Sequence, residues 1–229
     1  MRGHVLWEGT SRIDGKSPIV AIATMKTVNR KTGNMVQTWI LRRDISPVEA
    51  VKSRADVAIC GACIHRGDMK TGKGRSCYVN VGQAPLSVWR AYHRGSYSAE
   101  WDSATFEGRK VRLGAYGDPA AIPVSVWADV VALAAGHTGY THQWRNPKLR
   151  DTLALCQAST DSASDLKSRP KGSGSFRVLT VLEAPQKGEI LCPSEQGVSC
   201  AECLMCDGSG NAIAIPVHGS GASNYNARN

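Results

Sequence analysis

The sequence predicts an α/β protein whose strands form a mainly parallel sheet. From residue 56 to residue 191, short apolar runs typical of strands alternate with segments that carry helix-start signals, which is the pattern of βαβ units. Two further strand-like runs flank a turn-forming segment at residues 29–34, and this arrangement predicts an N-terminal β-hairpin. With 229 residues, the chain can form one substantial core or two small domains.

Each element follows from a local pattern. The hairpin strands are expected at residues 18–25 and 35–42, which are apolar runs. Ser46, Pro47 and Glu49 resemble the N-cap, the first position and an early carboxylate of a short helix. Further helices are expected at residues 84–95, from Pro123 to about residue 135, and from Ser162 or Ser164 onward. Further strands are expected at residues 56–59, 110–116, 139–144, 152–158, 176–182, 189–191 and 212–217.

The same patterns divide the chain into four parts. Residues 1–55 are expected to form the hairpin and a helix packed on the core, and residues 56–191 to form the core itself. Residues 192–219 are expected to form a cysteine-rich segment. Residues 220–229 are small and polar, which predicts a flexible tail.

Seven of the eight cysteines fall into two groups. The first cysteine set, with the spacing C-x2-C-x13-C, is Cys60, Cys63 and Cys77. The second cysteine set, with the spacing C-x7-C-x2-C-x2-C, is Cys192, Cys200, Cys203 and Cys206. The chain starts without the apolar run of a signal peptide, and no window is apolar enough to span a membrane. A cytoplasmic protein is therefore expected, and in that reducing compartment clustered cysteines favour metal ligation over disulfides.

The spacing of the second cysteine set favours a [4Fe–4S] cluster. Three cysteines at consecutive two-residue gaps, with a fourth outside, match a ferredoxin-like loop, whereas a structural zinc site usually has two separated CxxC pairs. The first cysteine set has three thiolates, so its fourth ligand is Cys156, His65 or a substrate. A substrate there would make the iron an open Lewis-acid site, and His65 would close a Cys3His zinc finger. Cys156 stands alone on an expected strand, which is typical of a small buried side chain.

Polar residues follow several expected strands, and α/β active sites lie at the carboxyl ends of parallel strands. Asp118, between Gly117 and Pro119, is either a turn former or a polar pocket group. His142 and Trp144 either line a pocket or pack in the core. No G-x-S-x-G elbow, P-loop or helix-opening G-x-G-x-x-G is present, so the corresponding hydrolase and nucleotide chemistries have little support.

Five segments together resemble a family of uncharacterised proteins of bacteriophages, plasmids and related mobile elements. These segments are residues 29–33, 60–63, 77–82, 192–206 and 215–219. The resemblance covers nearly the whole chain and implies a mobile-element origin in a bacterial host cell. It implies no particular reaction.

The chain is also similar, more loosely, to radical S-adenosylmethionine enzymes. In that family three cysteines after the first strand hold a [4Fe–4S] cluster whose fourth iron binds the cofactor, and the fold is a partial or full β/α barrel of the TIM type. Here the first cysteine set follows residues 56–59 and is itself followed by Tyr78. Gly117, Asp118 and Pro119 are similar to the segment that holds the cofactor's amino group. The family's loop is C-x3-C-x2-C, so the first cysteine set departs from it in spacing.

Two functions are compatible with these observations. In the first, the chain is an iron–sulfur enzyme whose first cluster binds and reductively cleaves S-adenosylmethionine, while the second cluster relays electrons or anchors substrate. Arg112, Arg145 and Lys148 would hold a phosphate-bearing or nucleic-acid substrate, which the net charge of +9 permits although the basic residues are dispersed. In the second, iron–sulfur clusters or zinc are structural, and the protein binds nucleic acid or a host protein. A fully ligated first cysteine set would favour the second function.

Overall fold

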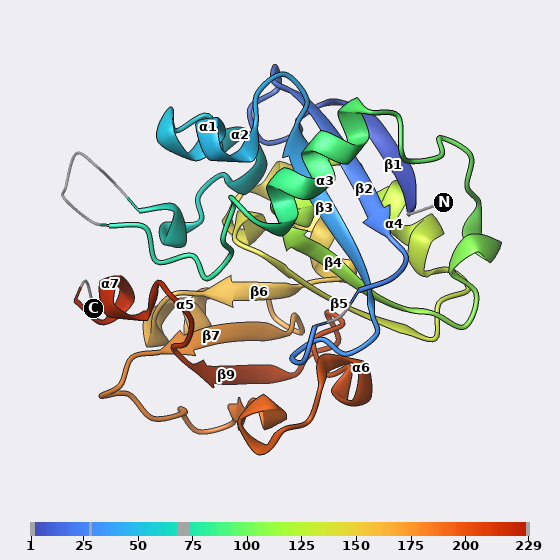
Figure 1. Cartoon of the computed structure of the whole chain (residues 1–229). Helices are drawn as coiled ribbons and strands as arrows, with labels where there is room; N and C mark the ends of the chain where they lie inside the picture. The colour runs from blue at the N-terminus through green and yellow to red at the C-terminus, as the bar shows by residue number, and fades with distance from the viewer. Residues whose placement is uncertain (1–2, 28, 68–73, 228–229) are drawn as a thin grey trace.

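The computed structural model describes residues 3–27, 29–67 and 74–227. In these residues nine strands form one sheet in the order β1-β2-β3-β4-β5-β6-β7-β9-β8 (Figure 1). The strands are β1 Gly3–Thr10, β2 Pro18–Thr24, β3 Val36–Arg42, β4 Lys110–Tyr116, β5 Gly136–Thr141, β6 Gln157–Thr160, β7 Ser175–Leu179, β8 Ile190–Leu191 and β9 Ala212–Pro216. The α-helices are α1 Pro47–Lys52, α2 Val57–Cys60, α3 Ala84–His93, α4 Val124–Val131, α5 Ala163–Ser168, α6 Cys200–Cys203 and α7 Ala222–Asn226.

The N-terminal part of the sheet is antiparallel and contains the predicted hairpin. β2 pairs with β3, and the side chain of Asn29 closes the turn between them by accepting hydrogen bonds from the backbone N–H groups of Lys31 and Thr32. β1 pairs antiparallel with the other side of β2. No apolar run predicts β1, because about half of its side chains are only partly buried or exposed polar groups at the edge of the sheet.

All other strand pairings, from β3 through β9 to β8, are parallel. The predicted α/β class with a mainly parallel sheet is therefore confirmed. β1 and β8 are the two edges of the described sheet, which is open. No helix in the described part of the chain has the length and apolar character needed to cross a membrane.

Two of the predicted strands are wrong. Residues 56–59 belong to the start of α2, where the carboxylate of Asp56 accepts a hydrogen bond from Arg66 at 2.7 Å. A four-residue apolar run does not distinguish a strand from a buried helical turn. Residues 152–156 belong to the 3-10 helix Pro147–Ala154 and the turn after it, so only the last two residues of the predicted strand 152–158 lie in β6.

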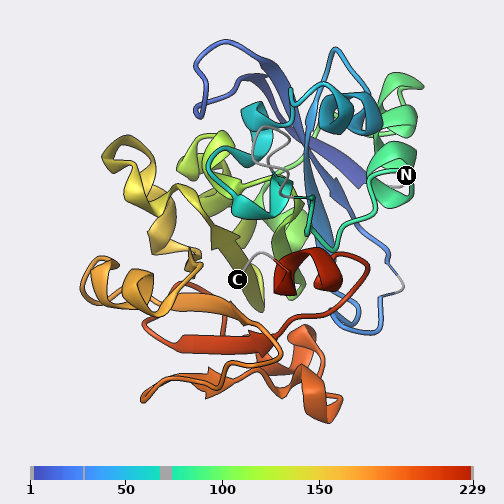
Figure 2. The same ribbon diagram turned by 90° about the vertical axis from the view of Figure 1, so that its left-hand side faces the viewer.

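The C-terminal segment differs from the expected flexible tail. It contains α7, which Figures 1 and 2 both place beside the segment that carries the first cysteine set. Tyr225 is 2% exposed and its ring stacks on His65, with 5.3 Å between the ring centroids. Asn224 donates a hydrogen bond to the carbonyl of Arg75 at 2.9 Å. A buried aromatic side chain thus anchors a segment whose composition is otherwise polar. Residues 68–73 and, of the expected tail, residues 228–229 lie outside the described residues.

Candidate functional site

A cavity of about 400 Å³ lies along one face of the sheet. Successive side chains of a strand point to opposite faces. On β4, Val111 and Leu113 lie in the hydrophobic core while Arg112, between them, lines the cavity. Neighbouring strands contribute Tyr140 from β5 and Phe176 from β7. The cavity therefore extends across the parallel part of the sheet.

The carboxyl ends of the parallel strands supply the polar wall of this cavity. Asp118, His142, Asp161 and His218 lie just beyond the ends of β4, β5, β6 and β9, and all four line the cavity. Parallel strands end at the same edge of a sheet, which is why residues far apart in sequence meet there. Asp161 has no distinctive local pattern, and its position after an expected strand is the signal that would have found it.

All three residues of the first cysteine set line the same cavity. α2 ends at Cys60, and Gly61 turns the chain at a φ of +51°, a conformation that favours glycine. Gln143 holds this turn, because its Oε1 accepts from the backbone N–H of Ala62 at 3.2 Å and its Nε2 donates to the carbonyl of Cys60 at 3.1 Å. The same Nε2 also donates to Asp118 Oδ2 at 3.1 Å. Gln143 thus ties the first cysteine set to the ends of β4 and β5.

The thiols of the first cysteine set are buried and influence one another. Burial raises the pKa of Cys60, and the charges of Cys63, Asp56 and Cys77 raise it further. Burial also raises the pKa of Cys77, while Arg75 lowers it. In the described residues, no three cysteine sulfurs lie within 4.8 Å of one another.

Within the described residues, three polar atoms in the cavity wall are buried without a hydrogen-bond partner. They are the hydroxyl of Tyr116 and the Nε atoms of Arg66 and Arg75. Burial raises the pKa of Tyr116, and the charge of Cys60 raises it further. An unsatisfied buried donor costs about 1–3 kcal/mol, so donors beside thiols are suited to a bound group that accepts hydrogen bonds.

The segment 117–119 forms both a turn and part of the cavity wall. Gly117 has a φ of +83°, and a Cβ there would lie 2.7 Å from the carbonyl oxygen of Ile40. The carboxylate of Asp118 accepts hydrogen bonds from the backbone N–H groups of Ala120 at 3.0 Å and His142 at 2.8 Å. With the bond from Gln143, three of its roughly four acceptor sites are occupied. Asp118 is therefore a turn former and a cavity residue at once.

Arg112 lies in the same cavity without an acidic partner. It is 8% exposed, and its Cζ lies 4.3 Å above the centroid of the Tyr140 ring. Its Nη2 donates to the hydroxyl of Tyr78 at 3.3 Å. Burial lowers the pKa of Arg112, but the charges of Tyr140, Tyr78 and Cys200 outweigh that effect and raise it. No Asp or Glu in the described residues forms an ion pair with Arg112.

The second cysteine set lines a separate cavity of about 20 Å³. Cys192 follows β8, Cys200 and Cys203 lie on α6, and Cys206 follows that helix; all four line this small cavity. Cys192 and Cys200 line the large cavity as well. Tyr140 also lines both cavities. Burial raises the pKa of Cys206 to about 12, although a hydrogen bond from Tyr140 lowers it.

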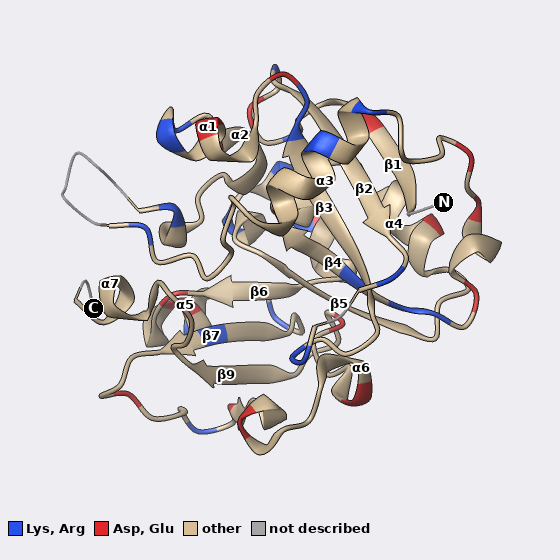
Figure 3. Cartoon of the chain, in the orientation of Figure 1, with Lys and Arg blue, Asp and Glu red and all other residues tan. Residues whose placement is uncertain are grey.

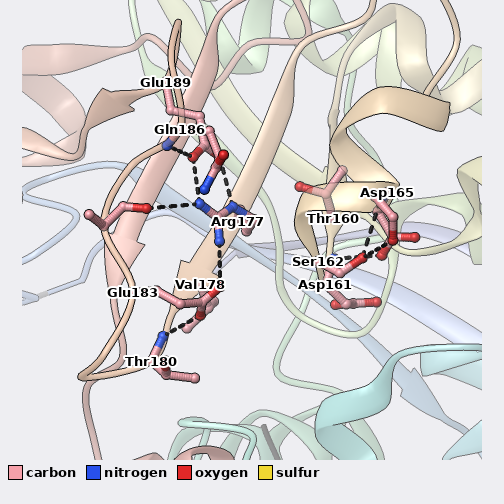
Figure 4. Close-up of polar contacts among 12 residues, drawn as sticks. Thr160, Asp161, Ser162, Asp165, Arg177, Val178, Thr180, Glu183, Gln186 and Glu189 are labelled. Atoms are coloured by element: carbon pink, nitrogen blue, oxygen red, sulfur yellow. Dashed lines mark hydrogen bonds and ion pairs between the residues drawn. The ribbon is translucent and has the colours of Figure 1, made fainter.

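A buried ion-pair network holds the chain that leads into the second cysteine set (Figure 4). Arg177, 1% exposed on β7, donates two hydrogen bonds to Glu189 at 2.9 and 2.6 Å and one to Glu183 at 2.8 Å. At the start of α6, Ser199 and Glu202 form a capping box, in which Glu202 accepts from the backbone N–H of Ser199 at 2.9 Å. Both ends of the segment from residue 189 to residue 203 are thus fixed by polar side chains.

The structure separates the remaining predicted site residues. Cys156 is 0% exposed in the hydrophobic core and does not line the cavity, which agrees with a small buried side chain. His65 lies with His142 and Asp161 in a cluster whose ligand atoms are within 4.8 Å of one another. Arg145 forms an ion pair with Asp165 at 2.6 Å and does not line the cavity, and neither does Lys148.

Sequence reasoning missed Tyr116 and Asp161, which line the cavity, and Gln143, which holds the turn after Cys60. Each lies at or beyond the end of a parallel strand, but none belongs to a motif.

Comparisons of the chain with models of protein families, with curated proteins and with solved structures find no match.

Proposed function

We propose that this chain is an iron–sulfur protein whose two cysteine sets each bind a [4Fe–4S] cluster, with the first cluster facing a small ligand that carries a carboxylate or phosphate group in the large cavity. The observation that carries the proposal is that Cys60, Cys63 and Cys77 share this cavity with Tyr78, Gly117 and Asp118. These are the residues on which the similarity to radical S-adenosylmethionine enzymes rests, so S-adenosylmethionine is the first ligand to test. The open sheet with one face toward a cavity supports a partial β/α barrel. A phage or plasmid origin and the host cytoplasm belong to the same proposal.

The sequence spacing of the second cysteine set favours a cluster over a single zinc ion, because three cysteines at consecutive two-residue gaps match a ferredoxin-like loop. With Zn–S bonds of about 2.3 Å, the sulfur atoms around one tetrahedral zinc lie about 3.8 Å apart. No three cysteine sulfurs in the described chain lie within 4.8 Å of one another, so the thiols of this structure are not arranged as they are around one tetrahedral zinc ion.

The charges around the first cysteine set also suit an anionic cluster. Arg66 and Arg75 line the same cavity, and their charges act against the rise in the pKa of Cys60 and Cys77, respectively. Their unpartnered Nε atoms and the hydroxyl of Tyr116 are donors that cluster sulfur can accept. When bound, the cluster would supply an electron and, at the first set, an iron with one open position. The protein side chains exclude water and hold the thiolates in place.

Arg112 is the group that we expect to hold the ligand's carboxylate or phosphate. A buried guanidinium with no acidic partner is costly unless a bound anion neutralises it. Arg112 lies between the two cysteine sets, since it lines the cavity of the first and its charge acts on Cys200 of the second. Lys and Arg are otherwise interspersed with Asp and Glu over many elements (Figure 3). A small anion in the cavity therefore fits better than a long nucleic-acid surface.

The test is a measurement of iron and sulfide on protein purified without oxygen. About eight irons and eight sulfides per chain are expected, with an electron paramagnetic resonance signal of reduced clusters that S-adenosylmethionine perturbs. Arg112→Leu should keep both clusters and weaken the perturbation. About two zinc ions and no sulfide would contradict the proposal and support structural metal sites.

A further inference from the structure

A third cluster of metal-binding side chains lies on the wall of the large cavity. It consists of His65, His142 and Asp161, whose ligand atoms all lie within 4.8 Å of one another. His65 comes from the 3-10 helix Ile64–Arg66, and the other two residues directly follow β5 and β6. No part of the proposed cluster chemistry uses these three side chains together.

The distances within this cluster fit a shared ion. His142 Nε2 lies 3.2 Å from Asp161 Oδ1. Two adjacent ligand atoms about 2.1 Å from one octahedral metal ion lie about 3.0 Å apart, so this pair needs little movement to bind one. The rings of His65 and His142 meet edge to face, with 5.7 Å between centroids. Two imidazoles and one carboxylate on one side of an ion leave its other positions open.

Neighbouring residues hold the side chain of His65 and the backbone of His142. The Nδ1 atom of His65 is hydrogen-bonded to the hydroxyl of Ser76 at 3.0 Å, and the ring stacks on Tyr225. The backbone N–H of His142 donates to Asp118 at 2.8 Å. Partners that fix ligand orientation in this way are typical of metal sites.

Hydrogen bonds also fix the loop that carries Asp161. The carboxylate of Asp161 is available to a cation. The backbone N–H of Asp161 donates to Asp165 Oδ2 at 2.9 Å, and Ser162 accepts from the backbone N–H of Asp165 (Figure 4). Arg145 pairs with Asp165 at 2.6 Å. In the described residues Asp161 forms an ion pair with His142 and with no Lys or Arg. Its side chain is 16% exposed and that of His142 is 13% exposed, so an ion there would be largely shielded from water.

We propose that His65, His142 and Asp161 bind one divalent first-row metal ion, such as Fe²⁺ or Mn²⁺, separately from the two cysteine sets. The ligand set is the 2-His-1-carboxylate arrangement, which binds hard to borderline ions and leaves open positions. All three residues line the large cavity, so a ligand in the cavity can reach those positions. The site adjoins the first cysteine set, because the side chain of His142 interacts with Cys63.

Mn²⁺ is the appropriate probe, because it prefers imidazole and carboxylate ligands to thiolates. Cluster-loaded protein is titrated with Mn²⁺, and the free ion is followed by its six-line electron paramagnetic resonance signal. One ion per chain is expected to bind. Asp161→Asn, which preserves size and removes the charge, should weaken binding at least about tenfold. His142→Gln should do the same, and His218→Ala, a cavity histidine outside the cluster, should leave affinity within about twofold of the unmodified protein.

Iron and sulfide are measured on every variant, so that loss of the clusters is distinguished from loss of the Mn²⁺ site. Asp161→Asn is the deciding variant, because the backbone of Asp161 rather than its carboxylate anchors the loop. Unmodified protein that leaves the full signal of free Mn²⁺ would overturn the proposal. Equal Mn²⁺ affinity in Asp161→Asn, His142→Gln and the unmodified protein would overturn it as well.

Discussion

The two cysteine sets differ in how the chain builds them. The second set comes from one short segment, residues 192–206, and its four cysteines line a cavity of about 20 Å³. The first set joins Cys60 and Cys63 to Cys77 across a long loop, and its cavity of about 400 Å³ also contains unpartnered polar groups. The second set has four thiols and little space, whereas the first has three thiols and ample space. The set with fewer thiols has the larger cavity. This is expected if the second site is closed by its four thiols and the first site binds a small molecule.

Removal of one thiol from each set is the strongest way to test this contrast. Cys60→Ala should lose about four of eight irons together with the response to S-adenosylmethionine, because the open site is destroyed. Cys203→Ala should also lose about four irons but keep that response. Iron content and the paramagnetic spectrum with and without the cofactor are the measurements. If Cys203→Ala abolishes the response while Cys60→Ala preserves it, the assignment of the open site is wrong.

Glu189→Gln should destabilise the segment that carries the second cysteine set and leave the first cysteine set unchanged. The side chain of Glu189 is 0% exposed and forms two hydrogen bonds with Arg177, so loss of its charge should destabilise the fold by about 3 kcal/mol near neutral pH. Burial raises the pKa of Glu189, but Arg177 outweighs this and lowers it below 4.5. The carboxylate therefore stabilises the protein above about pH 4.5, and this contribution is lost as the pH falls through the lower folded value.

Urea denaturation of both proteins across this pH range tests the prediction. The difference in unfolding free energy between the unmodified protein and Glu189→Gln should be largest near neutral pH and shrink below about pH 4.5. The response of the first cluster to ligand should not change. A difference independent of pH would show that the carboxylate charge is not the cause.

The sequence predicts the parts of the fold that local patterns determine. The β2–β3 hairpin, α3 and β4 follow from apolar runs, turn residues and a proline near a helix start. The helical state of α2 does not, because it depends on contacts of Asp56 with Arg66, ten residues further along the chain. The wall of the cavity is harder still to predict, since polar residues after separate strands come together only when the strands pair.

Gln143 shows this limit in one residue and provides the next test. Its side chain forms hydrogen bonds with Ala62, Cys60 and Asp118, whose sequence separations from it range from 25 to 83 residues. Gln143→Ala should destabilise the protein by about 2 kcal/mol, because it removes the hydrogen-bond partner of the buried Asp118 carboxylate and of two partly buried backbone groups. The first cluster should then release iron to a chelator faster, while the second releases it at an unchanged rate. Faster release from both clusters would mean that Gln143 stabilises the whole sheet and not the first cysteine set.

The smallest expected effect concerns the cap of α6. Ser199 donates its hydroxyl to Glu202 at 2.7 Å within the capping box that starts the helix of Cys200 and Cys203. Ser199→Ala should cost about 1 kcal/mol, and Ser199→Asp, which can also cap a helix, should restore part of it. Because the cap touches only the second cysteine set, iron release from that cluster alone should accelerate, by about fivefold for 1 kcal/mol if the lost cap acts through opening of the helix. Equal acceleration of both clusters would contradict independent sites and favour a single cooperative unit.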